Sequence, residues 1–319
     1  MYFKSAWEGN NSWHLYLIGF LLSMGGYLIG QIPLTLLLVY KVYSNTHLGP
    51  DDITAFQENM NFQKFGISTN VGFLLMIIIF VFAMLGLLLA LKIHGKSLMS
   101  LITPNKKINY HKLLFGFGLW AIFMVVTEMI SYYLHPEEYT FRFSLSSFLP
   151  LLLISVFLLP VQTSFEELFF RGYLMTGLGR ATGSKYLTII ITSVLFALMH
   201  SMNPEVAKYG LGTMMFYYFS AGAFLAIITV MDDSLELALG VHAATNMLGA
   251  TLVTYSGSVL QTDTLFLAQE TRPWIMILYF YVAAITFYII CARKYNWAPI
   301  QKLAEPVLPP VPTQENIIT

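Results

Sequence analysis

The chain has 319 residues, of which 56% are hydrophobic and only 11% charged, and its formal net charge is zero. Soluble domains carry about 25% charged residues, so this composition excludes an ordinary soluble domain and places the chain in a membrane. The neutral balance gives no reason to expect a nucleic-acid partner. The single cysteine, Cys291, excludes an internal disulfide, a Cys-rich zinc cluster and a dithiol redox motif.

Long apolar runs follow one another along the chain. A helix needs roughly 20 apolar residues to cross the hydrocarbon core of a bilayer. The sequence therefore predicts an all-α, polytopic membrane helix bundle with about eight transmembrane helices. We expect the first of them to be retained rather than cleaved as a signal peptide. The runs lie near residues 14–40, 70–92, 113–134, 147–170, 186–202, 209–230, 235–255 and 273–292.

The connections between these runs differ in charge. Basic residues are concentrated in 92–112, in 171–185 and after the last run, whereas 41–69 and 135–146 are acidic. By the positive-inside rule, the basic connections and both termini face the cytoplasm. An even number of spans agrees with this orientation. The 41–69 connection is long enough to form a small external cap or an amphipathic helix.

The chain divides into a membrane domain and a short tail. We expect the polytopic membrane domain to cover residues 1–297 and the tail to cover 298–319. The tail sequence, APIQKLAEPVLPPVPTQENIIT, is rich in proline and polar residues, which predicts a disordered cytoplasmic segment. No internal repeat is visible in the membrane domain, which disfavours a transporter built from inverted halves.

The fourth apolar run ends in Glu166-Glu167-x-x-x-Arg171. On a helix, Glu167 and Arg171 lie four residues apart on one face and can pair. Glu166 points about 100° away from Glu167, so we do not expect the two carboxylates to share a partner. Ionised groups at membrane depth usually face a bundle interior or a water-filled cavity. By itself, the motif favours a charge cluster where the fourth span meets the cytoplasm.

Two more polar groups interrupt later runs. Phe196 and His200 lie four residues apart at the end of the fifth run, and His242 and Asn246 have the same spacing in the seventh. A lone histidine at a helix end is more often an interfacial residue than a catalyst. Polar side chains inside an apolar helix need partners, because an unpaired polar group in lipid costs several kcal/mol. Asn246 alone would be explained by contact between helices, but the pair with His242 is less easily explained in that way.

Together these residues are sufficient for hydrolysis by water. A glutamate can remove a proton from water. Histidine can orient that water, shuttle protons or bind a metal. Asparagine and histidine can stabilise the oxyanion of a tetrahedral intermediate. A triad with a serine or cysteine nucleophile is poorly supported, and the chain has no His-Glu-x-x-His zinc helix.

The motifs EELFFR, FALMH and HAATN, in this order and spacing, resemble the CPBP family, also called the CAAX protease and bacteriocin-processing or Abi family. Its eukaryotic relative is the type II CAAX prenyl endopeptidase. The resemblance covers roughly residues 145–256, a CPBP-like catalytic core, and SLMSLITP at 97–104 is similar to an upstream family feature. Glu236 departs from the pattern, since an aromatic residue is common at that position. Glu128, in the third run, lies outside every motif, and we give it no catalytic role.

The resemblance implies a role for each matching residue. Glu166 is expected to be the general base that activates water, with His200 acting on the same water. His242 and Asn246 are expected to form the oxyanion hole. In an alternative, Glu166, His200 and His242 hold a divalent metal such as zinc, which catalytic sites bind through three protein ligands plus water. The reading without a metal needs no cofactor, and both readings stay open.

The resemblance also implies the class of function. Glu167 and Arg171 are expected to be a structural pair that supports the site. We expect an intramembrane endopeptidase, integral to the cell membrane if bacterial. It would cut a membrane-associated protein or peptide near the cytoplasmic face, on a substrate that arrives along or within the lipid bilayer. Two alternatives remain: a non-catalytic scaffold or immunity protein with the same fold, and a proton-coupled transporter that uses these groups as a relay.

Overall fold

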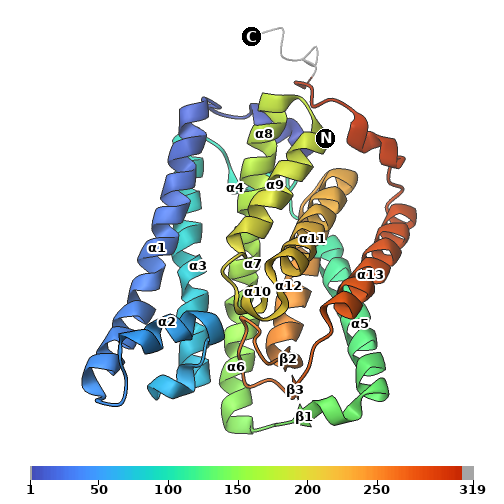
Figure 1. Cartoon of the computed structure of the whole chain (residues 1–319). Helices are drawn as coiled ribbons and strands as arrows, with labels where there is room; N and C mark the ends of the chain where they lie inside the picture. Colours follow the sequence, from blue (N-terminus) through green and yellow to red (C-terminus); the bar gives the residue numbers. More distant parts are fainter. Residues whose placement is uncertain (1, 311–319) are drawn as a thin grey trace.

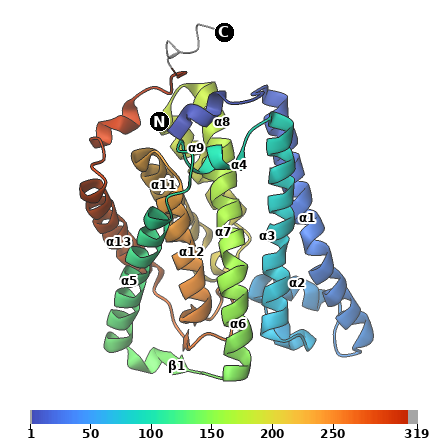
Figure 2. The same ribbon diagram turned by 180° about the vertical axis from the view of Figure 1, so that it is seen from behind.

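The computed structural model describes residues 2–310, apart from the side chains of residues 57 and 58, and it is a bundle of helices (Figures 1 and 2). Within the described part, six helical stretches are long and apolar enough to cross a bilayer, and each coincides with a predicted run. They are α1 (Trp13–Ser44), α3 (Thr69–His94), α5 (Tyr110–Leu134), the stack α6 to α8 (Leu145–Thr182), α11 (Leu211–Asp232) and α13 (Pro273–Lys294). The prediction of an all-α polytopic bundle is confirmed.

The other two predicted runs also form helices, but shorter ones. They are α9 (Lys185–Met199), with 15 residues, and α12 (Glu236–Thr251), with 16. A helix of 15 residues is about 22 Å long, which is less than the thickness of the hydrocarbon core. α12 is largely buried inside the bundle, whereas α9 buries one face and exposes the other. Both helices lead to residues of the predicted site.

Short elements close the two ends of the bundle. The predicted cap over 41–69 contains α2 (Pro50–Asn59) and a 3₁₀ turn, η2 (Phe62–Phe65). A small sheet at the same end has the strand order β1-β3-β2, with β1 antiparallel and β2 parallel to β3. The strands are β1 (Tyr139–Phe141), β2 (Val253–Tyr255) and β3 (Phe266–Ala268), and the remaining elements are η1 (Tyr2–Trp7), α4 (Leu98–Ile102), η3 (Pro136–Glu138), α10 (Pro204–Tyr209) and η5 (Ile300–Ala304). We call this end, which holds α2 and the sheet, the sheet end, and the opposite end, which holds η1, α4 and η5, the η1 end.

The fourth predicted span continues well beyond the glutamate pair. α6 (Leu145–Phe157) and α7 (Leu159–Glu167) are separated at Leu158, with Pro160 in the first turn of α7. After Glu167 the chain forms a π-helical segment, η4 (Leu168–Leu174), and then α8 (Met175–Thr182). Glu166 therefore lies near the middle of a helical stack of 38 residues. The expectation that the motif marks the cytoplasmic end of the span is wrong, because charged side chains inside the bundle ended the apolar pattern but not the helix.

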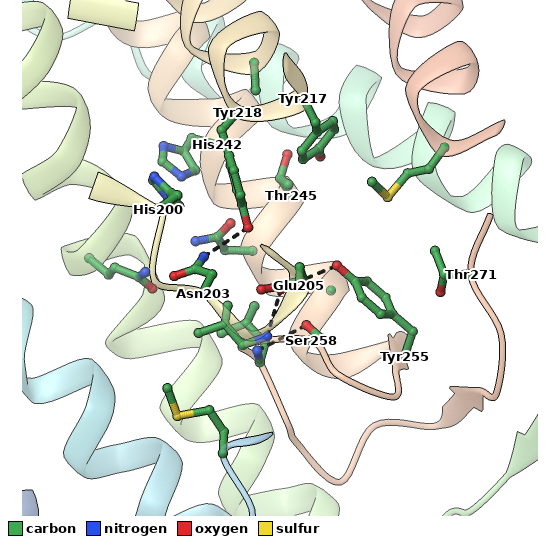
Figure 3. Close-up of a pocket in the computed structure, with 18 of the residues that line it drawn as sticks. His200, Asn203, Glu205, Tyr217, Tyr218, His242, Thr245, Tyr255, Ser258 and Thr271 are labelled. Carbon is green, nitrogen blue, oxygen red and sulfur yellow. Dashed lines mark hydrogen bonds between the residues drawn. The ribbon is translucent and has the colours of Figure 1, made fainter. Parts of the chain in front are cut away.

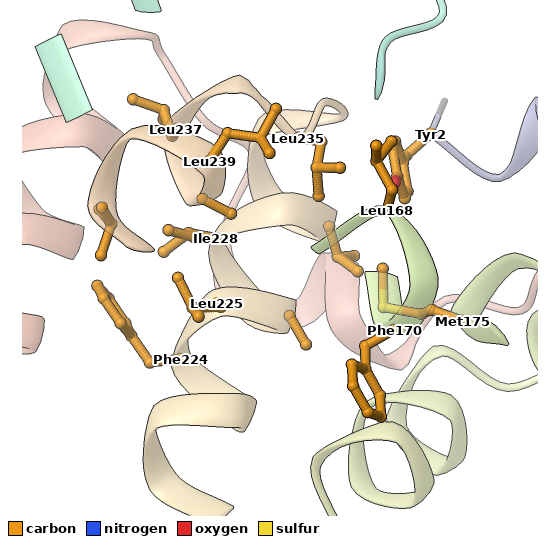
Figure 4. Packing of buried hydrophobic residues seen from close by; sticks show 14 of the residues in the cluster. Tyr2, Leu168, Phe170, Met175, Phe224, Leu225, Ile228, Leu235, Leu237 and Leu239 are labelled. Carbon is orange, nitrogen blue, oxygen red and sulfur yellow. The ribbon is translucent and has the colours of Figure 1, made fainter. Parts of the chain in front are cut away.

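Large apolar side chains fill the centre of the bundle between α7, η4, α11 and α12 (Figure 4). The hydrophobic packing includes Leu168 and Phe170 from η4 and Phe224 and Ile228 from α11. α5 and α12 approach closely where both carry small residues. A Cβ added to Gly240 would lie 2.1 Å from the carbonyl oxygen of Leu113. This close approach fixes the position of α12, two residues before His242.

Asp233, after α11, holds both described ends of the chain. It accepts a hydrogen bond from the Tyr2 amide (3.0 Å) and forms an ion pair with Lys302 Nζ (2.8 Å). Beyond it, Leu303 and Val307 are buried. The prediction of a disordered tail from residue 298 is therefore wrong as far as Pro310, because these apolar side chains dock on the bundle. Residues 311–319 lie outside the described part, and the cytoplasmic location of both ends and the division at 297 stay predictions.

Candidate active site

Three helical regions bring the predicted catalytic residues to one cavity of about 790 Å³. Glu166 comes from α7, His200 follows the last turn of α9, and His242 and Asn246 lie one turn apart on α12. All four line this cavity, and Figure 3 shows the two histidines at one end of it. The structure thus assembles residues that are separated by 80 positions in the sequence. Glu167 and Arg171 lie behind them, away from the cavity lining.

The pair behind the site is fully buried. Arg171 Nη1 donates to Glu167 Oε1 at 2.7 Å, and Arg171 Nη2 donates to the carbonyl oxygen of Gly222 at 3.1 Å. Both side chains have no exposed surface. Two buried charges are stable only when they are paired and hydrogen-bonded. The predicted pairing of Glu167 with Arg171 therefore matches the geometry, and it ties η4 to α11.

His242 lies between the two adjacent carboxylates. Its Nδ1 is 2.7 Å from Glu167 Oε1, and its Nε2 is 3.7 Å from Glu166 Oε2. The prediction that the two carboxylates face different partners is thus wrong, because an imidazole ring offers one nitrogen to each. Glu167 also binds Arg171, so we assign it as an ionised acceptor and place a proton on His242 Nδ1.

Glu166 is buried, with 6% of its surface exposed, and it has no arginine or lysine partner among the described residues. Its Oε1 accepts a hydrogen bond from Gln162 Nε2 at 3.2 Å, one turn earlier on α7. Its Oε2 has no hydrogen-bond partner within the described part of the chain. A carboxylate in this state is held in position but keeps an acceptor free for water or substrate. Sequence reasoning did not select Gln162, although its spacing of four from Glu166 was a usable signal.

The His200 side chain is held by a hydrogen bond to a backbone carbonyl and by contacts of its ring with aromatic side chains. Its Nδ1 lies 2.7 Å from the carbonyl oxygen of Phe196, so Nδ1 carries the proton and Nε2 is the free acceptor. The His200 ring stacks on Tyr218 with a centroid distance of 4.4 Å. Tyr218 in turn accepts a hydrogen bond from Asn203 at 3.0 Å. Neither Tyr218 nor Asn203 belongs to a motif, and no pattern in the sequence connected them with His200.

Phe196 is the packing centre of the site. Its ring lies 4.5 Å from that of His200 and 6.2 Å from that of His242, while the guanidinium of Arg171 lies 4.5 Å from its centroid. One aromatic residue therefore contacts the two histidines and the buried cation. This explains physically why a phenylalanine stands four residues before His200. Asn246 lies on the cavity side of α12 and is half-buried.

A metal does not fit these residues as they are arranged. Glu166, His200 and His242 are ligand types that zinc accepts. Among the described residues, however, the ligand atoms of these three do not lie within 4.8 Å of one another. The group that meets this distance is His135, Glu137 and Glu138 at the sheet end, where Glu138 is already paired with Arg272. The predicted metal set stays a hypothesis that needs side-chain movement.

Comparisons with known proteins agree with this site. The family model described as type II CAAX prenyl endopeptidase Rce1-like matches residues 145–248, which contain all three motifs. The chain is also 32% identical over 255 residues to the protein YyaK of Bacillus subtilis (strain 168), itself uncharacterized. This similarity covers 79% of the present chain and 82% of YyaK. The chain belongs to the Rce1-like family. No solved structure matches it.

Membership of the Rce1-like family sets the class of the protein. With the six apolar helices, it makes the chain an integral, multi-pass membrane protein. At family level the chain is a CAAX-protease-like intramembrane protease, a hydrolase of peptide bonds. The departure from the family pattern at Glu236 has a structural explanation here. Glu236 begins α12 and accepts a hydrogen bond from the amide of Asn109, the residue before α5, at 3.1 Å.

Proposed function

We propose that this protein is an intramembrane endopeptidase in which Glu166 activates the attacking water. The observation that carries the proposal is that Glu166, His200, His242 and Asn246 line one cavity, with the Glu166 carboxylate held by the Gln162 amide rather than by an arginine or lysine. A carboxylate without an arginine or lysine partner remains able to take up a proton. Its substrate is a membrane-associated protein or peptide.

The first step is attack by water. Glu166 takes a proton from the water as the water oxygen bonds to the carbonyl carbon of the scissile peptide. His200, with Nδ1–H held by the Phe196 carbonyl, presents Nε2 as a second acceptor that orients the same water. The geometry supports this division of roles because each group keeps one free acceptor on the cavity side.

The second requirement is a donor for the oxyanion of the tetrahedral intermediate. The Asn246 amide supplies one N–H. His242 supplies another from Nε2 only when the ring is doubly protonated, because Nδ1–H is committed to Glu167. Glu167 is a positioning residue that keeps the His242 ring oriented.

The last step is departure of the amine. Glu166 returns the proton that it took from water to the nitrogen of the scissile bond, and the carbon–nitrogen bond breaks. The products are a carboxylic acid at one new terminus and an amine at the other. Every proton in this sequence is carried by residues of the chain, and no step passes through a metal. A zinc ion held by Glu166, His200 and His242 is the competing hypothesis.

The experiment compares new protein termini in membranes that contain the wild-type chain or Glu166→Gln at equal expression. Gln is isosteric and can still contact Gln162, so the variant should fold and lose cleavage entirely. Glu137→Gln is the matched control, because Glu137 is an exposed carboxylate with 70% of its side-chain surface accessible. It should give the wild-type termini. Wild-type termini from a folded Glu166→Gln protein would overturn the mechanism.

A further inference from the structure

The cavity extends from the catalytic residues to one end of the bundle. Its lining includes Tyr139 of β1, Ala268 of β3 and Thr271 after β3. Figure 3 shows Thr271 and Tyr255 on the side away from the two histidines. No lining residue belongs to η1, α4, α8 or η5, among the residues that the structure describes. The cavity therefore extends toward the sheet end and not toward the η1 end, and we take the sheet end as the side from which the substrate enters.

The two ends of the bundle differ in charge. Of the 17 lysines and arginines, Arg171 lies in the middle and five lie at the sheet end, while the rest lie at the η1 end. The five are Lys41, Lys64, Arg142, Lys208 and Arg272. By the positive-inside rule, the η1 end faces the cytoplasm and the sheet end faces the opposite side of the membrane. The earlier expectation of cleavage near the cytoplasmic face therefore does not agree with the position of the cavity.

The path from the sheet end to the site is acidic. Besides Glu166, the lining contains the carboxylates of Glu128, Glu138, Glu205 and Glu270, and Arg272 is the one guanidinium or ammonium among the described lining residues. Arg272 is bound to Glu138 through both carboxylate oxygens. That pair is neutral, which leaves three carboxylates along the path without a cation.

Glu205 is the most buried of these three. It follows His200 by five residues, and only 3% of its surface is exposed. Its Oε1 accepts hydrogen bonds from the Val259 amide at 2.8 Å and from the Tyr255 hydroxyl at 3.4 Å. Its Oε2 has no partner in the described part of the chain. A buried carboxylate with one free oxygen, in the cavity that also holds His200, is suited to bind a substrate cation.

We propose that the cavity takes a cationic peptide segment from the extracytoplasmic side, and that Glu205 binds a lysine, arginine or amino group close to the scissile bond. The proposal rests on the proposed endopeptidase activity and adds the side of the membrane and the class of substrate. Glu128 and Glu270 attract the segment along the path. Glu205 then binds the cationic group, because a charge-assisted hydrogen bond would supply the partner that Oε2 lacks.

The first test concerns the side of the membrane and does not depend on activity. Cys291 is the single cysteine and is buried, so Cys291→Ala gives a cysteine-free background. Thr271→Cys places a thiol at the mouth of the cavity, and Lys106→Cys places one at the η1 end. In intact cells, a membrane-impermeant maleimide should label Thr271→Cys but not Lys106→Cys. Lys106→Cys should be labelled only after the cells are permeabilised. The reverse pattern would overturn the proposal.

The second test concerns the substrate. The termini that depend on Glu166 should lie in extracytoplasmic segments, with lysine or arginine near the cut. A synthetic peptide that spans one such site is then compared with its Lys/Arg→Gln analogue. For purified Glu205→Gln, we expect the KM for the cationic peptide to rise about tenfold with kcat nearly unchanged. Its KM and kcat for the neutral analogue should equal those of the wild type. Glu270→Gln should change KM less, because Glu270 is exposed to solvent.

The outcomes separate the two proposals. If no termini depend on Glu166, the endopeptidase activity itself fails. If such termini exist but lie in cytoplasmic segments, or if Glu205→Gln affects both peptides equally, the activity stands and this inference is wrong.

Discussion

The imidazole Nδ1 of His242 lies 2.7 Å from Oε1 of Glu167, although the two residues are 75 positions apart in the chain. The same carboxylate oxygen accepts the 2.7 Å hydrogen bond from Arg171. Glu167 is thus shared between a buried cation and a histidine of the proposed oxyanion hole. The stability of the bundle and the orientation of the site depend on one side chain.

Glu167→Gln should be destabilising and nearly inactive. It leaves the Arg171 guanidinium buried without its counter-ion, which typically costs about 3–5 kcal/mol, and it releases His242. Thermal unfolding in detergent and peptide cleavage measure the two effects. The double variant Glu167→Gln/Arg171→Met should recover most of the stability but not the activity. Recovery of both would mean that Glu167 serves the fold alone.

Asn246→Ala should lower kcat roughly 100- to 1,000-fold, the usual effect of removing one oxyanion donor. Its unfolding temperature should stay close to that of the wild type, since Asn246 is half-buried and lines the cavity. Thr245→Val is the matched control on the same helix. It removes a hydrogen bond from Trp120 Nε1 (2.8 Å) that lies outside the proposed chemistry. Equal losses of activity in the two variants would argue against an oxyanion role.

Metal removal should leave cleavage intact. The ligand atoms of Glu166, His200 and His242 do not converge within 4.8 Å, which a bound zinc would require of them. The purified protein is treated with a chelator, its metal content is measured, and cleavage is assayed before and after zinc is added back. Loss of activity on chelation and full recovery with zinc would favour the metal mechanism.

Gly240→Ala should destabilise the bundle and lower activity, because the added methyl group would lie 2.1 Å from the Leu113 carbonyl oxygen and push α12 away from α5. The displacement would move His242, two residues later on the same helix. Gly118→Ala is the control, since nothing lies within 4 Å of a Cβ at that position of α5. The unfolding temperature and cleavage rate of both variants should be compared. A tolerated Gly240→Ala would show that the two helices separate easily.

Asp233 should make the docking of both chain ends dependent on pH. Burial raises the pKa of this carboxyl group, but the Lys302 ammonium and the Tyr2 amide outweigh burial and hold the pKa below its ordinary value. The stabilisation is therefore complete above the ordinary aspartate pKa of about 3.9 and is lost as the pH falls through the lower folded value.

Asp233→Asn provides the check at neutral pH. It keeps a residue that tolerates the positive φ of 57° at this position and removes only the charge. We expect a loss of about 0.5–1 kcal/mol, since the Lys302–Asp233 pair is partly exposed. Proteolysis of the segment around Leu303 should become faster in this variant. Wild-type protection would mean that the apolar contacts of Leu303 and Val307 are sufficient.

Much of the architecture followed from local pattern. Each apolar run is a helix in the structure, because a segment in lipid must satisfy its backbone hydrogen bonds internally. Spacing by four placed Glu167 beside Arg171 and His242 one turn before Asn246, because residues four apart share one face of a helix. The motifs Glu166-Glu167-x-x-x-Arg171, Phe196-x-x-x-His200 and His242-x-x-x-Asn246 were enough to indicate the family.

The depth and direction of the site needed the tertiary structure. Glu166 ends an apolar run but not its helix, since hydropathy cannot distinguish a helix that leaves the membrane from one that turns a charged side chain into the bundle. Glu205 belongs to no motif, although α10 brings it to the cavity that holds His200. The meeting of Glu166, Glu167 and His242 depends on how α7 and α12 pack, and such contacts between helices leave no periodic trace in the sequence.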